Sequence, residues 1–280
     1  MKRRLKKLAT LFTVALLTIG CVTACGGSDT SNNSSLSGNI TLSGSTSMKK
    51  LAQALQEGFM AQNSGVRVNV EFNGSSAGIE QVLNGSVTIG NASRNLKEEE
   101  IMKGAVENIV AIDGIAVVVD NANTVTDLTT EELAQIYTGE IKNWSELGGT
   151  NSPIVVIGRE AGSGTRGAFE ELLEIEDMCA YAQELDSTGT VLANVSATPG
   201  AIGYVSLDVI DDSVTTVALD GVEATEENIT EGTYSLCRPF VMATKGEISA
   251  QDEITQAFFA YIASEEGKAI IQQVGLILPK

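Results

Sequence analysis

Short apolar runs alternate with amphipathic stretches along most of the chain. Runs rich in β-branched residues predict strands, and apolar positions at helical spacing predict the helices between them. The predicted strands are Asn39–Ser43, Val66–Phe72, Val87–Gly90, Ile109–Val119, Ile154–Gly158, Ile202–Ser206, Val214–Leu219 and Leu236–Thr244. The predicted helices are Met48–Gln62, Ala77–Leu83, Thr130–Tyr137, Thr165–Leu173, Val191–Ser196 and Ala250–Val274. Strands that alternate with helices predict an α/β fold with a mixed, mostly parallel sheet flanked by helices.

Helix ends are marked by specific residues at two places. Thr129 with Glu132 forms a capping box, and Gly139 follows as a stop signal. In the last helical stretch, Ser264 predicts the cap of a second helix after a break.

Two of the predicted strands are unusually long and are interrupted near their middle. Asp113-Gly114 interrupts Ile109–Val119, and Pro239 interrupts Leu236–Thr244. A chain that crosses between two lobes needs such a break in mid-strand. We therefore predict hinge crossings near residues 113 and 239. One lobe then contains 39–113 plus 239–280, and the other contains 114–238.

The first 38 residues have the pattern of an exported lipoprotein. A basic start and a short apolar core, Leu8–Ile19, predict a signal peptide over residues 1–24. Val22-Thr23-Ala24 before Cys25 resembles a lipobox, which makes Cys25 the expected lipidation site and Cys21 a weaker alternative. Small polar residues predict a flexible tether over 25–38. The alternative is an ordinary cleaved signal that leaves a soluble protein.

The charge of the predicted mature chain excludes several partners. Five of the 18 basic residues and none of the 36 acidic ones precede Cys25, so 13 basic residues remain and the net charge is −23. Such a surface repels nucleic acid and offers no polybasic patch to anionic lipid. We interpret Cys179 and Cys237 as buried free thiols, and we expect no metal and no cofactor.

Three loops share one design, in which a strand runs into small hydroxyl and glycine residues and then into a helix. They are Gly44-Ser45-Thr46-Ser47, Gly74-Ser75-Ser76-Ala77-Gly78 and Gly162-Ser163-Gly164-Thr165. Each leaves backbone N–H groups free at the positive end of a helix dipole, which is a site for an anion. Arg159, close to the third loop, adds a guanidinium.

Two enzyme motifs are matched formally in the same loops. Residues 162–167 fit GxGxxG, but no acidic residue suited to ribose ends a nearby strand. Residues 74–78 fit GxSxG, but Ser76 would need a histidine base and the chain has no histidine. A classical serine hydrolase is therefore excluded.

Around these loops the chain resembles the phosphate-binding proteins of the phosphate-specific ABC transporter. The resemblance rests on SGSTSM (43–48), NGSSAGI (73–79), IGNASRNLKEEE (89–100), AIDGIAVVV (111–119), LTTEELAQIYTGEIKNWSELGG (128–149), PIVVIGREAGSGTRGAFEEL (153–172), PGAIGYVSL (199–207) and GTYSLCRPFVMATK (232–245). It implies a two-lobed type II periplasmic-binding-protein fold with two hinge crossings. It further implies a monomer on the outer face of the bacterial membrane that delivers phosphate to ABC permease subunits.

The resemblance also implies the residues that bind the anion. Thr46 and Ser47 from the first loop, Ser75 from the second, and Ser163, Gly164 and Thr165 from the third would donate hydrogen bonds, together with Arg159.

One departure from the family concerns the choice of anion. Many members have an aspartate where Ser93 lies, and that aspartate accepts the proton that distinguishes hydrogen phosphate from sulfate. Asp113 is a candidate for this acceptor role, with a turn at the hinge as the alternative. The acid that often pairs with the arginine is replaced by Ala161, and Glu160 is the expected substitute. A binding protein for another oxyanion and a secreted phosphatase are the competing functions.

Overall fold

The computed structural model describes residues 36–280, so the predicted signal peptide, Cys25 and most of the predicted tether lie outside the described residues. The strands are β1 (Ser37–Gly44), β2 (Gly65–Phe72), β3 (Ile89–Ala92), β4 (Ala105–Val106), β5 (Ile109–Asp120), β6 (Asp127–Leu128), β7 (Val155–Arg159), β8 (Gln183–Leu185), β9 (Ala201–Ser206), β10 (Val214–Leu219) and β11 (Cys237–Lys245). The helices are α1 (Lys49–Gln62), α2 (Ser75–Asn84), α3 (Glu98–Met102), α4 (Thr130–Thr138), α5 (Gly164–Leu172), α6 (Thr188–Ala197), α7 (Glu226–Glu231), α8 (Glu253–Ala263) and α9 (Glu265–Gln273).

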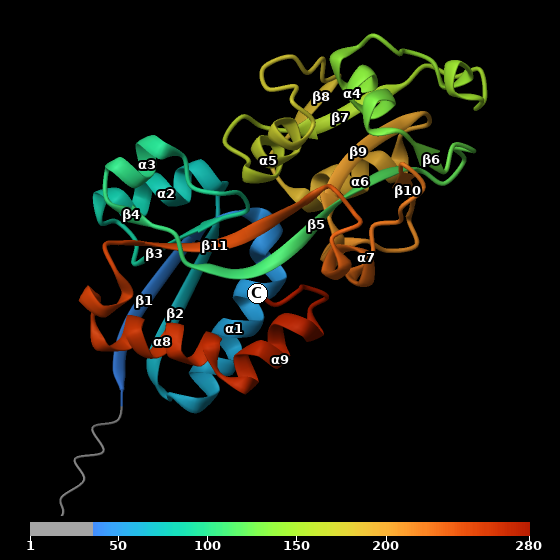
Figure 1. The fold of residues 1–280 in the computed structure, drawn as a ribbon. Coiled ribbons are helices and arrows are strands. Elements are labelled where there is room, and N and C mark those ends of the chain that lie inside the picture. The colour runs from blue at the N-terminus through green and yellow to red at the C-terminus, as the bar shows by residue number, and fades with distance from the viewer. Residues whose placement is uncertain (1–35) are drawn as a thin grey trace, which may run out of the picture. The chain divides into compact units, whose positions relative to one another are not determined.

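The sheet is mixed (Figure 1), and its strands follow the order β2-β1-β3-β11-β5-β9-β7-β8, with β10 and β4 attached to β5 and β11. Within residues 36–280, every antiparallel pairing between strands includes β5 or β11, and the other pairings are parallel. The α/β class is thus confirmed. The expectation of a mostly parallel sheet was wrong at its centre, because the two long strands run antiparallel to each other and to their neighbours.

The long strands β5 and β11 lie side by side and join two groups of elements (Figure 1). The first group contains α1, α2, α8 and α9, and the second group contains α4, α5 and α6. Asp113 lies opposite Arg238 in this pairing, and Ile112 lies opposite Pro239. Proline has no N–H to donate, and Ile112 instead exchanges backbone hydrogen bonds with Ile277, at 2.8 and 3.0 Å. The proline is therefore tolerated inside the sheet.

Side chains on β5 and β11 change their packing partners along each strand. Ala111 and Phe240 pack in a core formed with α1, α8 and α9, whereas Ile115 and Leu236 pack in a core formed with α4 and α5. The change falls between Ala111 and Ile115 on β5, and between Leu236, which directly precedes β11, and Phe240 on β11. The interruptions noted in the sequence lie within these intervals.

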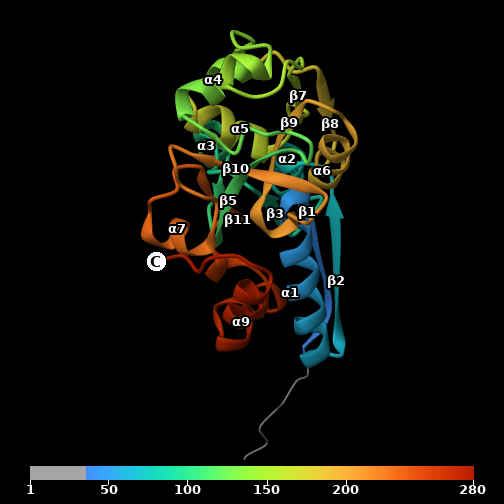
Figure 2. The ribbon, with the colours of Figure 1, turned by 90° about the vertical axis from the view of Figure 1, so that its right-hand side faces the viewer.

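The two faces of the sheet are covered by different helices (Figures 1 and 2). In the first group, α1, α8 and α9 pack on one face, and α2 packs on the other. In the second group, Val117 and Val119 face α4 and α5, while Val118 faces α6. This alternation follows from the two-residue period of a strand, and it explains why the segment Ile115–Val119 of β5 is apolar without interruption.

Most predicted helices and strands are confirmed, with differences at their ends. The break at Ser264 separates α8 from α9, and Thr129 caps α4 as predicted. Helix α6 begins at Thr188, earlier than predicted, because Ser187 caps it by accepting a hydrogen bond from the Thr190 N–H. Strand β1 begins at Ser37, so the last residues assigned to the tether belong to the sheet.

Short elements without a clear period were not predicted, namely α3, α7, β4, β6 and β8. Within residues 36–280, no helix is both long and apolar enough to cross a membrane.

Candidate anion-binding site

Four helix starts meet at one place in the structure. They follow β1, β2, β7 and β8, and they begin near Thr46, Ser75, Gly164 and Thr188. Parallel strands present their carboxyl ends at one edge of a sheet, so the helices that follow them begin close together. Each helix start directs free N–H groups and the positive end of its dipole toward this place.

Hydroxyl groups from these loops form a buried cluster. The Ser47 Oγ lies 2.7 Å from the Thr165 Oγ1 and 2.9 Å from the Thr188 Oγ1. The Ser93 Oγ accepts a hydrogen bond from the Ser45 Oγ at 2.8 Å and lies 3.4 Å from the Ser75 Oγ. The structure thus brings together the predicted residues Ser47, Ser75, Ser93 and Thr165; we refer to them, with Ser45, Thr46 and Thr188, as the hydroxyl cluster.

The cluster joins the two groups of elements on either side of β5 and β11. Ser47 belongs to the first group and Thr165 to the second. The backbone makes the same connection, because the Ser76 N–H donates to the Gly162 carbonyl at 3.1 Å.

Gly164 lies where no side chain would fit. A Cβ added there would lie 2.3 Å from the Ser75 Oγ and 2.9 Å from the Ser93 Oγ. Glycine therefore lets the start of α5 approach the hydroxyl cluster directly, as predicted for a backbone that binds an anion.

Arg159 is buried beside the cluster, with 2 % of its surface exposed. Its Nη1 donates to the Thr188 Oγ1 at 3.2 Å, and its Nη2 donates to the Glu160 Oε1 at 3.1 Å. The pairing with Glu160 is the one expected in place of the missing acid. The Arg159 Nε also donates to the Glu160 Oε2 at 3.3 Å, and the backbone carbonyls of Leu185 and Asp186 accept further hydrogen bonds at 3.1 Å each, so the orientation of the guanidinium is set on several sides.

Two other predicted residues have hydrogen bonds that define their positions. The Ser163 Oγ accepts from the Arg166 N–H at 3.3 Å and so caps α5. The Thr46 Oγ1 accepts from the Thr188 N–H at 3.2 Å, which joins the first loop to α6.

Asp113 has hydrogen-bond partners other than those expected of a ligand-facing acceptor. Its Oδ2 accepts from the Arg238 guanidinium at 2.8 and 3.1 Å, and its Oδ1 accepts from the Ser206 Oγ at 2.8 Å. Burial raises the pKa of Asp113, and the Arg238 charge opposes that rise. Both carboxylate oxygens are thus satisfied by the protein, and a direct acceptor role for Asp113 has no support in this geometry.

Sequence reasoning missed Thr188, which belongs to the hydroxyl cluster, and Arg238, which donates to the Ser93 carbonyl. Ser187-Thr188-Gly189-Thr190 has the same composition as the three recognised loops, and this signal could have identified it. Arg238 offered no such signal, because only the pairing of β11 with β5 and β3 brings it to Ser93.

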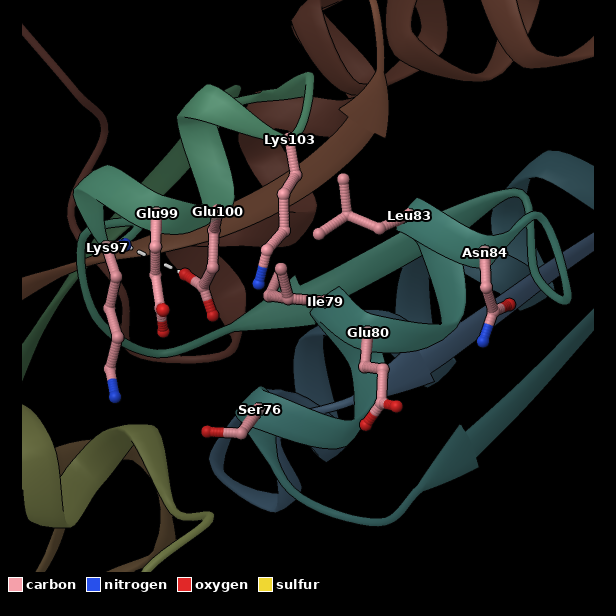
Figure 3. A pocket seen from close by; sticks show the side chains of 9 residues that line it. All are labelled: Ser76, Ile79, Glu80, Leu83, Asn84, Lys97, Glu99, Glu100 and Lys103. Atoms are coloured by element: carbon pink, nitrogen blue, oxygen red, sulfur yellow. Dashed lines mark hydrogen bonds between the residues drawn. The ribbon is translucent and has the colours of Figure 1, made fainter.

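A cavity of about 510 Å³ lies between α2 and α3 (Figure 3). Charged side chains of both signs line it, including Lys97, Lys103 and Glu80. It shares no residue with the hydroxyl cluster, although Ser76 at its edge follows Ser75 in the chain. The cavity is therefore separate from the candidate anion site.

Both predicted free cysteines are confirmed as unpaired. Cys179 and Cys237 are half-buried rather than fully buried. Burial raises the pKa of the Cys179 thiol to about 11, which keeps the thiol protonated at neutral pH.

The family to which the chain belongs is shown by its match to a superfamily profile. The PBP superfamily domain matches residues 29–266, which is most of the chain. The chain is therefore a member of the PBP superfamily.

Individual relatives show to which group within the PBP superfamily the chain belongs. The chain is 36% identical over 245 residues to the phosphate-binding protein PstS of Bacillus subtilis, covering 86% of this chain and 81% of that protein. A solved structure from Clostridium perfringens, described as a phosphate ABC transporter substrate-binding protein with bound phosphate, is 40% identical with a TM-score of 0.84, covering 87% of this chain and all of that one. An ABC-type phosphate transport receptor from Vibrio cholerae is 36% identical with a TM-score of 0.74, over 86% of this chain and 100% of that chain. Within the superfamily, the chain belongs to the PstS-type phosphate-binding proteins of ABC transporters, which are transport receptors and not enzymes.

Proposed function

We propose that this protein binds inorganic phosphate at the hydroxyl cluster and delivers it to the permease of an ABC importer. The observation that carries the proposal is the meeting of four helix starts around buried hydroxyls and one buried arginine. The relative from Clostridium perfringens, which is solved with bound phosphate, supports the choice of anion.

The site suits a dehydrated anion even though the protein is strongly acidic. Hydroxyls of Thr46, Ser47, Ser75 and Thr165 donate to phosphate oxygens, together with backbone N–H groups that include that of Gly164. Ser163 caps the helix that presents those N–H groups. Arg159 adds charge-assisted hydrogen bonds. Local donors within hydrogen-bond distance outweigh distant surface charge, which salt screens beyond about 10 Å.

Binding is coupled to closure of two lobes, 39–113 plus 239–280 and 114–238, about crossings near residues 113 and 239. Separate hydrophobic cores on the two sides of these positions support this division. The bond between Ser47 and Thr165 supports a closed arrangement, because its two hydroxyls come from different lobes. Phosphate would hold the lobes together by bonding to both.

The protein acts as a monomer outside the cytoplasm, anchored to the outer face of the bacterial membrane through a lipidated Cys25. The signal-like start and the lipobox-like residues support this placement. The permease of the importer then lies in the same membrane.

Selectivity for phosphate over sulfate depends on a neutral acceptor. The Ser93 Oγ accepts a hydrogen bond from Ser45 and can also accept the proton of hydrogen phosphate, which sulfate lacks. A serine repels sulfate less than an aspartate does, so another oxyanion is the second candidate ligand.

Titration calorimetry of the purified protein, stripped of bound ligand, tests this function with phosphate and then with sulfate. We expect tight phosphate binding at one site and no heat with sulfate. Comparable binding of sulfate would favour the second candidate, and no heat with either anion would contradict the proposal. A chromogenic phosphate ester should release no product, since the family is not enzymatic.

A further inference from the structure

Arg238 and Asp113 form a fully buried ion pair at the centre of the sheet. Their side chains are 1% and 0% exposed, and the Arg238 Nη2 lies 2.8 Å from the Asp113 Oδ2. They face each other across the β5–β11 pairing. Removing two charges from water is costly, and well-packed apolar residues would often be at least as stable at such a position. The pair therefore calls for an explanation beyond stability.

The hydrogen bonds of the pair lead to the anion site. The Arg238 Nη1 donates to the Ser93 carbonyl at 3.1 Å, and the hydroxyl of Ser93 lies in the hydroxyl cluster. On the other side, Asp113 accepts from Ser206 at the end of β9. A continuous chain of hydrogen bonds thus runs from β9 through the two crossing strands to Ser93.

The charge of Arg238 also acts on the site. Burial lowers the pKa of Arg238, and repulsion by the positive charge of Arg159 lowers it further. An anion bound beside Arg159 would reduce this repulsion. Ser93 carries no charge, and Arg238, paired with Asp113, brings a positive charge to its carbonyl.

We propose that Arg238 is a positioning residue of the anion site, which fixes the Ser93 peptide and adds a second positive charge behind the hydroxyl cluster while Asp113 holds it in place. This inference rests on the proposed function, since it assigns a role in phosphate binding. A lysine could not fully replace Arg238, because one planar guanidinium bonds to Asp113 and to the Ser93 carbonyl in different directions.

Arg238→Gln and Asp113→Asn are expected to change phosphate affinity in different ways. R238Q removes a charge-assisted bond to the Ser93 peptide and a positive charge behind the hydroxyl cluster, so the Kd for phosphate should rise about 10- to 100-fold. D113N removes the negative charge of Asp113 while its amide oxygen can still accept from Arg238, so phosphate should bind at least as tightly as in the native protein. Both variants should lower the thermal midpoint.

Glu100→Gln provides the matched control. Glu100 forms another buried ion pair, in which its two carboxylate oxygens each accept from Arg94 at 2.8 Å, and its hydrogen bonds go to Arg94 and Lys97 rather than to the hydroxyl cluster. E100Q should lower the thermal midpoint and leave the Kd for phosphate unchanged. R238K, which keeps the charge but not the planar fork, should bind phosphate with an affinity between those of the native protein and R238Q.

Calorimetric titrations of all these proteins with phosphate at one ionic strength distinguish the outcomes. A native affinity in R238Q, or a loss in D113N as large as that in R238Q, would show that the pair only stabilises the fold. If R238Q does not fold, the R238K variant provides the test, because a native phosphate affinity in R238K would overturn the inference. Failure of the native protein to bind phosphate would contradict the proposed function instead, so the two failures can be told apart.

Discussion

At the scale of single residues, the anion site depends on small and uncharged side chains. Gly164 admits the start of α5 to the hydroxyl cluster because it has no Cβ. Ser93 places a neutral hydroxyl, rather than a charged group, in the hydroxyl cluster. Small residues thus shape a site in which backbone N–H groups can contact an anion directly.

Gly164→Ala should weaken phosphate binding without unfolding the protein. The new methyl group would overlap the Ser75 and Ser93 hydroxyls, and such overpacking costs about 1–3 kcal/mol, or about 5- to 150-fold in Kd. Calorimetry measures the loss. Gly162→Ala in the same loop is the control, since no atom lies within 4 Å of its added Cβ. Equal affinities in the two variants would refute a close approach at Gly164.

At the scale of elements, helix ends have two different roles in this protein. The caps at Ser163 and Ser187 start helices that point at the anion site. The capping box of Thr129 and Glu132 starts α4, which contributes to the core of residues around Tyr137 and Phe169. A change at this second kind of cap should affect stability alone.

Thr129→Ala should lower the free energy of unfolding by about 1 kcal/mol, because the Glu132 N–H loses its acceptor. For a domain of this size the thermal midpoint should fall by roughly 2–4 °C. Thr129→Ser keeps the hydroxyl and should remain close to the native protein. Thermal melts measure both, and a changed phosphate affinity in T129A would contradict a purely structural role.

At the scale of the whole molecule, several contacts connect the first group of elements to the second. Besides the hydroxyl cluster, the Lys50 Nζ on α1 donates to the carbonyls of Asp208 and Val274, at 3.1 and 3.2 Å. Burial, followed by the neighbouring charge of Asp113, raises the pKa of Asp208 to about 6, while Lys50 and Arg238 oppose the rise. This carboxyl couples the stability of the fold to pH.

Asp208→Asn should stabilise the protein above about pH 6 and have little effect near pH 4. The pKa of Asp208 is higher in the folded than in the unfolded chain, so its stabilising contribution is complete below about pH 3.8 and is lost as pH rises through about 6. The gap in unfolding free energy between D208N and the native protein should reach about 1–3 kcal/mol. Urea denaturation from pH 4 to pH 8 measures it.

The control for this experiment is Asp211→Asn. The Ser213 hydroxyl and N–H lower the pKa of Asp211, so its contribution is present at neutral pH and is lost on acidification. The difference in unfolding free energy between D211N and the native protein should therefore change with pH in the opposite direction. A gap for D208N that is independent of pH would contradict the assigned pKa.

Much of the fold and of the site could be predicted from local signals. Alternating apolar runs predicted the long strands and helices, and hydroxyl–glycine loops before helices predicted Ser47, Ser75 and Thr165. Short elements such as β8 and α3 were missed, because a few residues show no period. Thr188 was missed because the start of α6 was placed too late.

The sequence by itself determined which loops can bind an anion, because free N–H groups at a helix start are a local property of a few neighbouring residues. It also determined that a histidine-based hydrolase is impossible, since the chain has no histidine. Only the tertiary structure decided that Asp113 pairs with Arg238 and that Arg238 reaches Ser93. These partners are far apart in the chain, and strand register sets their contacts.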